Sequence, residues 1–190
     1  MELAEIYSKV ASHMIKGIMF HEQMANYYDF LCLEGYKCCH EYHMYDEMCE
    51  YRSLCKYVIN HHNMLIPDER IENPEAIPAS WYKHVRQDAD TTTKKDAVKT
   101  GLTAWVNWEK DTKKLYEKMY TELMNLGEVA SACKMKKFIS KVDHELKKAE
   151  KYHLNKEAIN YDIGAIISEQ HYKHEKYKSK LREDLIKNIC

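Results

Sequence analysis

Glutamate and histidine residues recur at helical spacings that could place several metal-binding side chains inside a bundle of helices. A dinuclear iron or manganese site in such a bundle takes one Glu from each of two helices and a Glu-x-x-His pair from each of the other two. Glu22 and Glu109 suit the two single carboxylates, and Glu47 is a further candidate between them in the chain.

The Glu-x-x-His pairs that would complete this site are not where the pattern requires them. The segment around Glu47 offers His40-x-x-His43 and Glu47-x-x-Glu50, so a glutamate stands where a histidine is needed. The pair in Glu150-x-x-His153 has the right spacing, but it lies near the end of its helical segment. The set of ligands is therefore incomplete.

Two interpretations of these polar residues follow. We favour a hydrogen-bonded polar cluster without a cofactor and without catalytic residues, since buried polar groups in a helical core must be paired. Its members would be His21, His43, Glu47 and Glu109. The alternative is a site for Fe or Mn that uses the three candidate glutamates with some of His43, Glu50, Asp143 and Glu145.

The apolar residues that would position these side chains repeat every three or four residues, which is the period of a helix face. This pattern predicts helices at about 3–33, 36–64, 93–126, 128–154 and 163–187, with Gly35 ending the first. Three prolines interrupt the long connection 65–92. We expect a single all-α domain over residues 1–190, a bundle of four long helices with a long crossover and an additional C-terminal helix.

The run His21-Glu22-Gln23-Met24-Ala25-Asn26-Tyr27-Tyr28, followed by Leu33-Glu34-Gly35-Tyr36, resembles the first-helix glutamate and hairpin turn of ferritins and rubrerythrins. The resemblance covers roughly the first third of the chain. It implies a ferritin-like fold and, for the metal alternative, an oxidase or a metal-storage protein. Among the family's ligands it matches Glu22 and Glu109, with Glu47 as a further candidate.

Composition excludes several other functions. The chain has 29 Lys and Arg against 30 Asp and Glu, so its net charge of -1 implies no general affinity for nucleic acid or an anionic membrane. The sequence has no long apolar stretch and no basic start of a secretory signal, so we expect a cytoplasmic protein. The five glycines form no phosphate-binding loop or nucleophile elbow, which excludes nucleotide-dependent and hydrolase chemistry.

The seven cysteines are an odd set that lies mostly within helical pattern, so we expect reduced thiols. No C-x-x-C occurs, and the neighbours Cys38 and Cys39 cannot both face one metal on a regular helix. The cysteine pattern therefore predicts no structural zinc site.

The long connection carries an aromatic and basic group, Trp81, Tyr82, Lys83 and Arg86, of the kind that suits a contact surface. Together with Tyr7 to Val10 and Trp105 to Glu109, the segment resembles small helical prophage proteins of gut Firmicutes, some of which are anti-CRISPR inhibitors. This resemblance implies a non-catalytic module that binds a protein partner, such as a type II CRISPR effector ribonucleoprotein. Our main functional hypothesis is an inhibitor of a host-defence nuclease, with the metal protein as its alternative.

Overall fold

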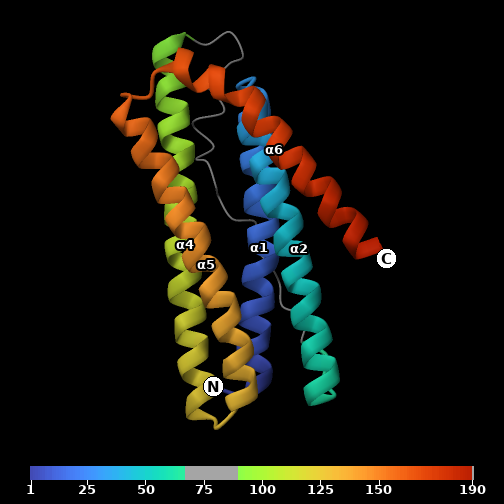
Figure 1. Cartoon of the computed structure of the whole chain (residues 1–190). Helices are drawn as coiled ribbons and strands as arrows, with labels where there is room; N and C mark the ends of the chain where they lie inside the picture. The colour runs from blue at the N-terminus through green and yellow to red at the C-terminus, as the bar shows by residue number, and fades with distance from the viewer. Residues whose placement is uncertain (67–89, 190) are drawn as a thin grey trace.

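The computed structural model describes residues 1–66 and 90–189, and all regular structure in that part of the chain is helical. The helices are α1 (Leu3–Phe30), α2 (Glu34–His62), α4 (Thr91–Asn125), α5 (Val129–Ala158) and α6 (Ile163–Ile189). α1 packs along α2 and α4 along α5, and the pairs meet mainly through α1 and α4. Figure 1 shows these four helices side by side, as expected of the predicted bundle.

The turn between α1 and α2 differs from the sequence prediction. Leu31 to Leu33 make the turn, where Cys32 adopts a positive φ of 58°, and Gly35 lies within the first turn of α2. The glycine is needed for packing, because a Cβ at Gly35 would lie 2.6 Å from the carbonyl oxygen of Gln170 on α6. Gly35 therefore allows two helices to approach closely and does not end the first helix.

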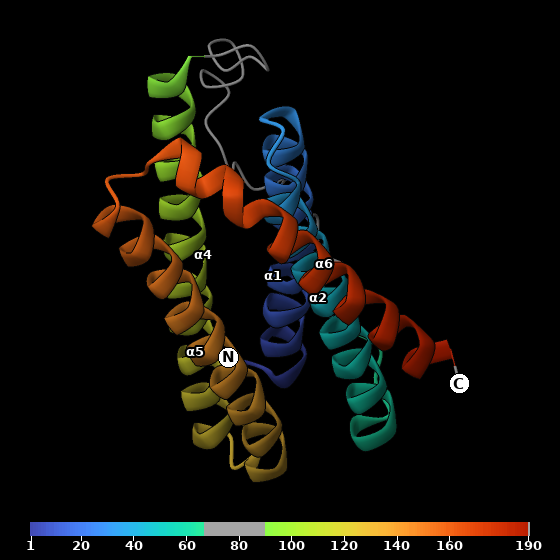
Figure 2. The same cartoon turned by 45° about the horizontal axis from the view of Figure 1, so that its top comes forward.

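α6 crosses from the end of α5 to pack against α2, and its C-terminal part extends away from the bundle (Figures 1 and 2). Two buried lysines line this contact. Lys156 of α5 donates to Glu169 at 2.5 Å, and the Lys173 ammonium lies over the ring of Tyr36, 4.0 Å from its centroid. The early part of α6 is thereby attached to both α2 and α5.

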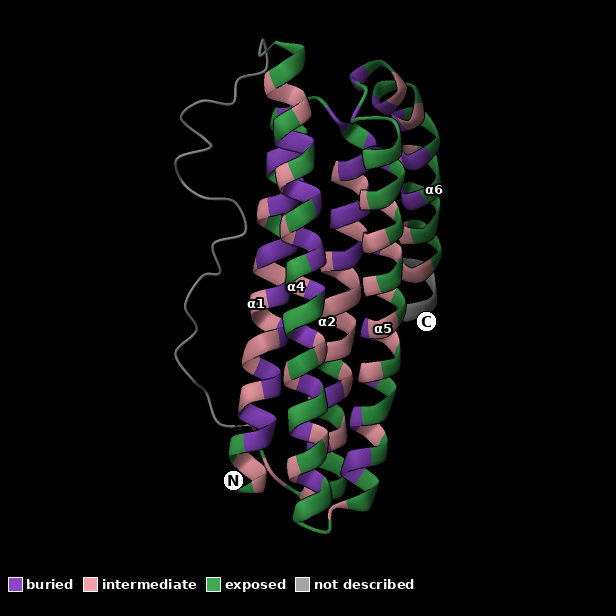
Figure 3. Ribbon diagram, turned by 90° about the vertical axis from the view of Figure 1, so that its left-hand side faces the viewer, coloured by how far each residue is buried: buried purple, intermediate pink, exposed green. Residues whose placement is uncertain are grey.

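Buried residues follow the inner faces of the four long helices (Figure 3). They form two apolar clusters. One contains Phe20, Met24, Leu102 and Trp105, and the other contains Val10, Met14, Leu54 and Tyr116. On α2, α4 and α5 the residues of one cluster are separated from those of the other by polar positions. This polar interval in the middle of the bundle contains the candidate site.

Candidate metal centre

The polar interval is a layer of side chains contributed by all four long helices. We call this set the polar layer: His21 of α1, His40, His43, Asp46, Glu47 and Glu50 of α2, Glu109 of α4, and Lys141, Glu145 and Lys148 of α5. Most of these residues line one small cavity of about 10 Å³. The layer therefore brings carboxyl and imidazole groups together at mid-height in the bundle.

Three histidines form the part of the layer that lies toward the α1–α2 turn. His21 Nδ1 and His40 Nδ1 are 3.0 Å apart, so one ring donates a hydrogen bond to the other, and His43 stacks on His21 with ring centroids 5.3 Å apart. Burial lowers the pKa of His21 to about 3 and holds those of His40 and His43 well below the ordinary value. All three rings are neutral at pH 7.

Two carboxyl groups at the cavity have no ion pair with a lysine of residues 1–66 or 90–189. Glu47 Oε2 is buried and has no hydrogen-bond partner among the residues that the structure describes. Burial, together with Glu50 and Glu109, raises the pKa of Glu47 well above its ordinary value. Glu109 accepts a hydrogen bond from Trp105 Nε1 at 2.9 Å, yet burial raises its pKa to about 8. Without a cation, both groups therefore favour the protonated form.

The remaining carboxylates are paired with two lysines of α5. Lys141 Nζ lies 2.8 Å from Asp46 and 2.7 Å from Glu50, and these two acids raise the lysine's pKa although burial opposes them. Lys148 Nζ lies 3.1 Å from Glu145 and donates to His43 Nε2 at 2.8 Å. The lysines neutralise one side of the layer and leave Glu47 and Glu109 uncompensated.

The space for Glu47 depends on a small residue of α1. A Cβ at Gly17 would lie 3.2 Å from the carboxyl carbon of Glu47, so any larger side chain there would press on this group. Within residues 1–66 and 90–189, the ligand atoms of the layer do not form a set of three that all lie within 4.8 Å of one another. A metal ion at the cavity would therefore require side-chain movements that bring three donors closer together.

The structure brings together only part of the predicted ligand set. Glu47 and Glu109 line the cavity with His21 and His43, the four residues that we expected to cluster. Glu22 is exposed and lies 3.4 Å from Asn26 Nδ2, so it cannot join Glu47 and Glu109, and its neighbour His21 occupies the interior place on α1.

Of the other ligands that the metal alternative includes, some lie at the cavity and one lies elsewhere. Glu50 and Glu145 line the cavity, whereas Asp143 pairs with Lys113 and Lys147 outside the layer. Sequence reasoning missed Lys141 and Lys148. Their signal was present: positions 141, 145 and 148 follow three- and four-residue steps and so share one face of α5.

The predicted contact group Trp81, Tyr82, Lys83 and Arg86 lies outside the described residues. Its role in binding a protein partner, including a CRISPR effector, stays a prediction. No helix in residues 1–66 and 90–189 combines the length and the apolar character needed to cross a membrane.

The structure is similar to archaeal ferritins. A closed form of the Archaeoglobus fulgidus ferritin made by site-directed mutagenesis matches with a TM-score of 0.75 and 14% identity, over 92% of this chain and 96% of that chain. An open-pore ferritin from the same hyperthermophilic archaeon gives 0.74 and 14% over 90% and 94%, and a humanized archaeal ferritin gives 0.73 and 13% over 90% and 94%. The sequence matches no protein-family model and no curated protein.

These similarities establish a ferritin-like bundle fold and confirm the predicted fold class. They also correct the expectation of no cofactor, because ferritin neighbours point to iron. The resemblance to prophage proteins finds no support in them.

Proposed function

We propose that this chain is a ferritin-like metal-binding protein that takes up iron or manganese at the polar layer. The observation that carries the proposal is the excess of buried acid: five carboxyl groups of the layer face only two lysines. Buried carboxylates that lack a counter-charge have a large desolvation cost, which a bound cation offsets. Glu47 Oε2, which has no hydrogen-bond partner in the described part of the chain, is the atom at which this need is greatest.

The donor types fit the metal. Carboxylate oxygens suit Mn, and imidazole nitrogen suits Fe, so Glu47, Glu109 and His43 form a set of ligands that matches these metals. Lys141 and Lys148 already hold the other acids, which supports one ion per chain and not the two of a dinuclear site. A bound iron or manganese ion would supply redox chemistry at a place shielded from water by the two apolar clusters.

Binding must displace protons. Since the pKa of Glu109 is about 8 in the metal-free protein, this carboxyl is largely protonated at neutral pH and gives up its proton when it ligates a cation. The same holds for Glu47, whose pKa is also raised. Apparent affinity should therefore increase with pH through the neutral range.

The test is titration of the metal-free protein with Mn²⁺, and with Fe²⁺ under anaerobic conditions, followed by calorimetry and metal analysis. We expect about one ion per chain, because the unpaired acids suffice for one set of ligands. Glu47→Gln and Glu109→Gln should each weaken binding by roughly 100-fold or more, since even changes in the outer shell of a site cost up to about 100-fold.

The matched control is Glu22→Gln, which changes an exposed glutamate of α1 outside the layer. It should bind as the unchanged protein does. A folded protein that takes up neither ion, or equal binding by Glu47→Gln and the unchanged protein, would contradict the proposal.

A further inference from the structure

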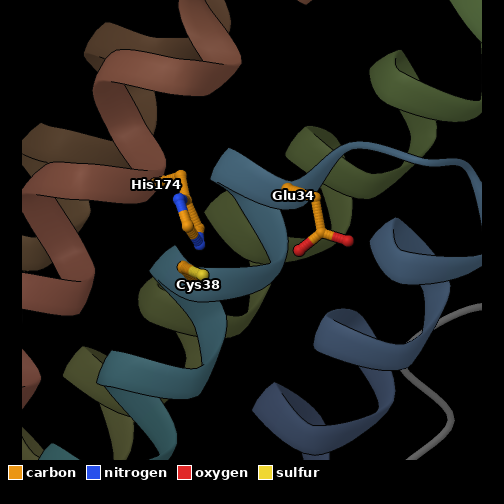
Figure 4. A group of neighbouring side chains, drawn as sticks. All are labelled: Glu34, Cys38 and His174. Carbon is orange, nitrogen blue, oxygen red and sulfur yellow. The ribbon is translucent and has the colours of Figure 1, made fainter.

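A second group of metal-binding side chains lies outside the bundle, where α6 crosses α2. One ligand atom each of Glu34, Cys38 and His174 lies within 4.8 Å of the other two. Figure 4 shows His174 on α6 facing Cys38 on α2, with Glu34 at the start of α2. In the described part of the chain, this is the only group of three such donors that meets that distance.

The helix contact explains why these residues meet. Glu34 and Cys38 are four residues apart and so lie on one face of α2. Gly35 lies between them and has no Cβ, which lets α6 approach α2 closely. A Cβ on Gly35 would lie 2.6 Å from the carbonyl oxygen of Gln170. His174 is one turn beyond Gln170 on the same face of α6, which directs its ring toward Cys38.

Two further observations indicate a site prepared for a ligand. His174 Nδ1 lies 3.2 Å from the carboxylate of Glu175, which favours a proton on Nδ1 and so makes Nε2 the nitrogen available to a metal. The same residues also line an open pocket of about 290 Å³, together with Glu41 and Tyr177. The pocket has room for an ion and a water molecule.

The other partners of these side chains are weak. Glu34 lies 3.8 Å from Lys37, whose ammonium is closer to Asp29 at 3.0 Å, so the Glu34 carboxylate can turn toward the pocket at little cost. Cys38 is a half-buried cysteine outside any disulfide, and its thiol has the Glu41 carboxylate as a hydrogen-bond partner. Glu41 follows Cys38 by three residues on the same helix face and can act as a fourth ligand.

We propose that Glu34, Cys38 and His174 bind a zinc ion that fastens α6 to α2. A thiolate and an imidazole with one or two carboxylates match the ligands that Zn²⁺ takes, with water or Glu41 in the fourth position. The thiol loses its proton to solvent when the bond between zinc and sulfur forms. The polar layer, in contrast, offers carboxylate and imidazole groups and no thiol.

This assignment differs from what the cysteine pattern predicts. The prediction from sequence considered only cysteines that lie near each other in the chain. Cys38 and Cys39 indeed point to different sides of α2, since Cys38 is half-buried and Cys39 is buried. The partners of Cys38 come instead from the preceding turn and from a helix about 140 residues later in the chain, a pairing that only the α6 crossing creates.

The test uses the full chain with Zn²⁺, titrated in competition with a chromophoric chelator, and Co²⁺ as a spectroscopic probe. One zinc ion per chain should bind with high affinity, and Co²⁺ should give a charge-transfer band that arises from a thiolate ligand. Cys38→Ser should abolish that band, and both Cys38→Ser and His174→Ala should weaken zinc binding by roughly 100-fold or more.

Matched controls are Cys133→Ser and His171→Ala, an exposed cysteine and an exposed histidine elsewhere on the chain. They should bind zinc as the unchanged protein does. Zinc binding that survives in both Cys38→Ser and His174→Ala, or a cobalt complex without a thiolate band in the unchanged protein, would overturn the assignment.

The two metal sites can be tested separately. Glu47→Gln in the polar layer should lose Mn²⁺ binding and keep the cobalt–thiolate band, whereas Cys38→Ser should do the reverse. Failure of one site therefore leaves the evidence for the other unchanged. If one of the Cys38 and His174 variants does not fold, the other variant and the cobalt spectrum of the unchanged protein decide the question.

Discussion

Lys148 Nζ donates a hydrogen bond to His43 Nε2 at 2.8 Å, so in the metal-free protein a lysine uses the lone pair that a metal ion would need. The same ammonium pairs with Glu145 at 3.1 Å. Lys148 and a cation at the polar layer are therefore competitors for His43, and the lysine also repels the cation. This relationship leads to the first prediction.

Lys148→Gln should increase the affinity for Mn²⁺ by about tenfold, which corresponds to about 1.4 kcal/mol. The change removes a positive charge near the cavity and frees His43 and Glu145. Calorimetric titration at pH 7 measures the effect. Lys147→Gln is the control, because Lys147 pairs with Asp143 on the exposed side of α5 and should leave affinity unchanged. Weaker binding by Lys148→Gln would show that the lysine supports the site.

The stability of the metal-free protein should be greatest near pH 6.5 in the presence of a chelator. Buried histidines have a folded pKa below the ordinary 6.5, about 3 for His21, so the unfolded chain binds more protons as pH falls below 6.5 and stability decreases. Glu109 has the opposite behaviour. Its folded pKa of about 8 exceeds the ordinary 4.5, so stability also decreases as pH rises from 4.5 to 8.

Between pH 6.5 and 8 the contribution of Glu109 alone amounts to about 2 kcal/mol, at about 1.4 kcal/mol per pH unit. Urea denaturation at a series of pH values measures this slope. Glu109→Gln should make the alkaline side less steep, because glutamine has no proton to lose, while the raised pKa of Glu47 maintains part of the decrease. Between pH 4.5 and 6.5 the stability of this variant should rise more steeply with pH, because the opposing contribution of Glu109 is gone. An equally steep alkaline side in this variant would assign the decrease to other groups.

Gly35→Ala should destabilise the protein by about 1–3 kcal/mol, the usual cost of adding atoms to a packed contact. The new Cβ would lie 2.6 Å from the backbone oxygen of Gln170 and 2.8 Å from Lys173 Cβ, so α6 must move. Thermal denaturation measures the loss, and zinc affinity should fall with it. Gly164→Ala, whose Cβ would meet only the Asp162 side chain at 3.3 Å, is the control.

The fold could be predicted from sequence because it rests on local signals. The three- and four-residue repeat of apolar residues locates the five helices of residues 1–66 and 90–189, and their predicted ends lie within a few residues of the observed ones. The failure at Gly35 has a physical cause. Glycine serves both at helix ends and at close helix contacts, and only the position of Gln170 distinguishes the two roles.

The candidate site could be predicted only in part. Glu109, and Glu47 as a further candidate, were identified by comparing the glutamates of the chain with the ligand pattern of a dinuclear site. Glu22 was expected in the interior because its position matches the family pattern. That pattern does not determine burial, and the neighbouring His21 is the buried residue. Lys148 was overlooked because lysine is not among the usual metal ligands. Its ion pairs nevertheless determine which carboxylates remain available to a metal.

The polar layer also has a consequence for the alignment of the helices. It lies between two apolar clusters, and each of the four long helices contributes to it. If one helix slid along its neighbours by a turn, about 5.4 Å, its carboxyl or imidazole groups would enter an apolar cluster and lose their partners. Apolar contacts alone would tolerate such a shift far better. His21, Glu47, Glu109 and Glu145 thus encode the axial register of the bundle, and a protein with leucine in their place would be expected to populate several shifted packings.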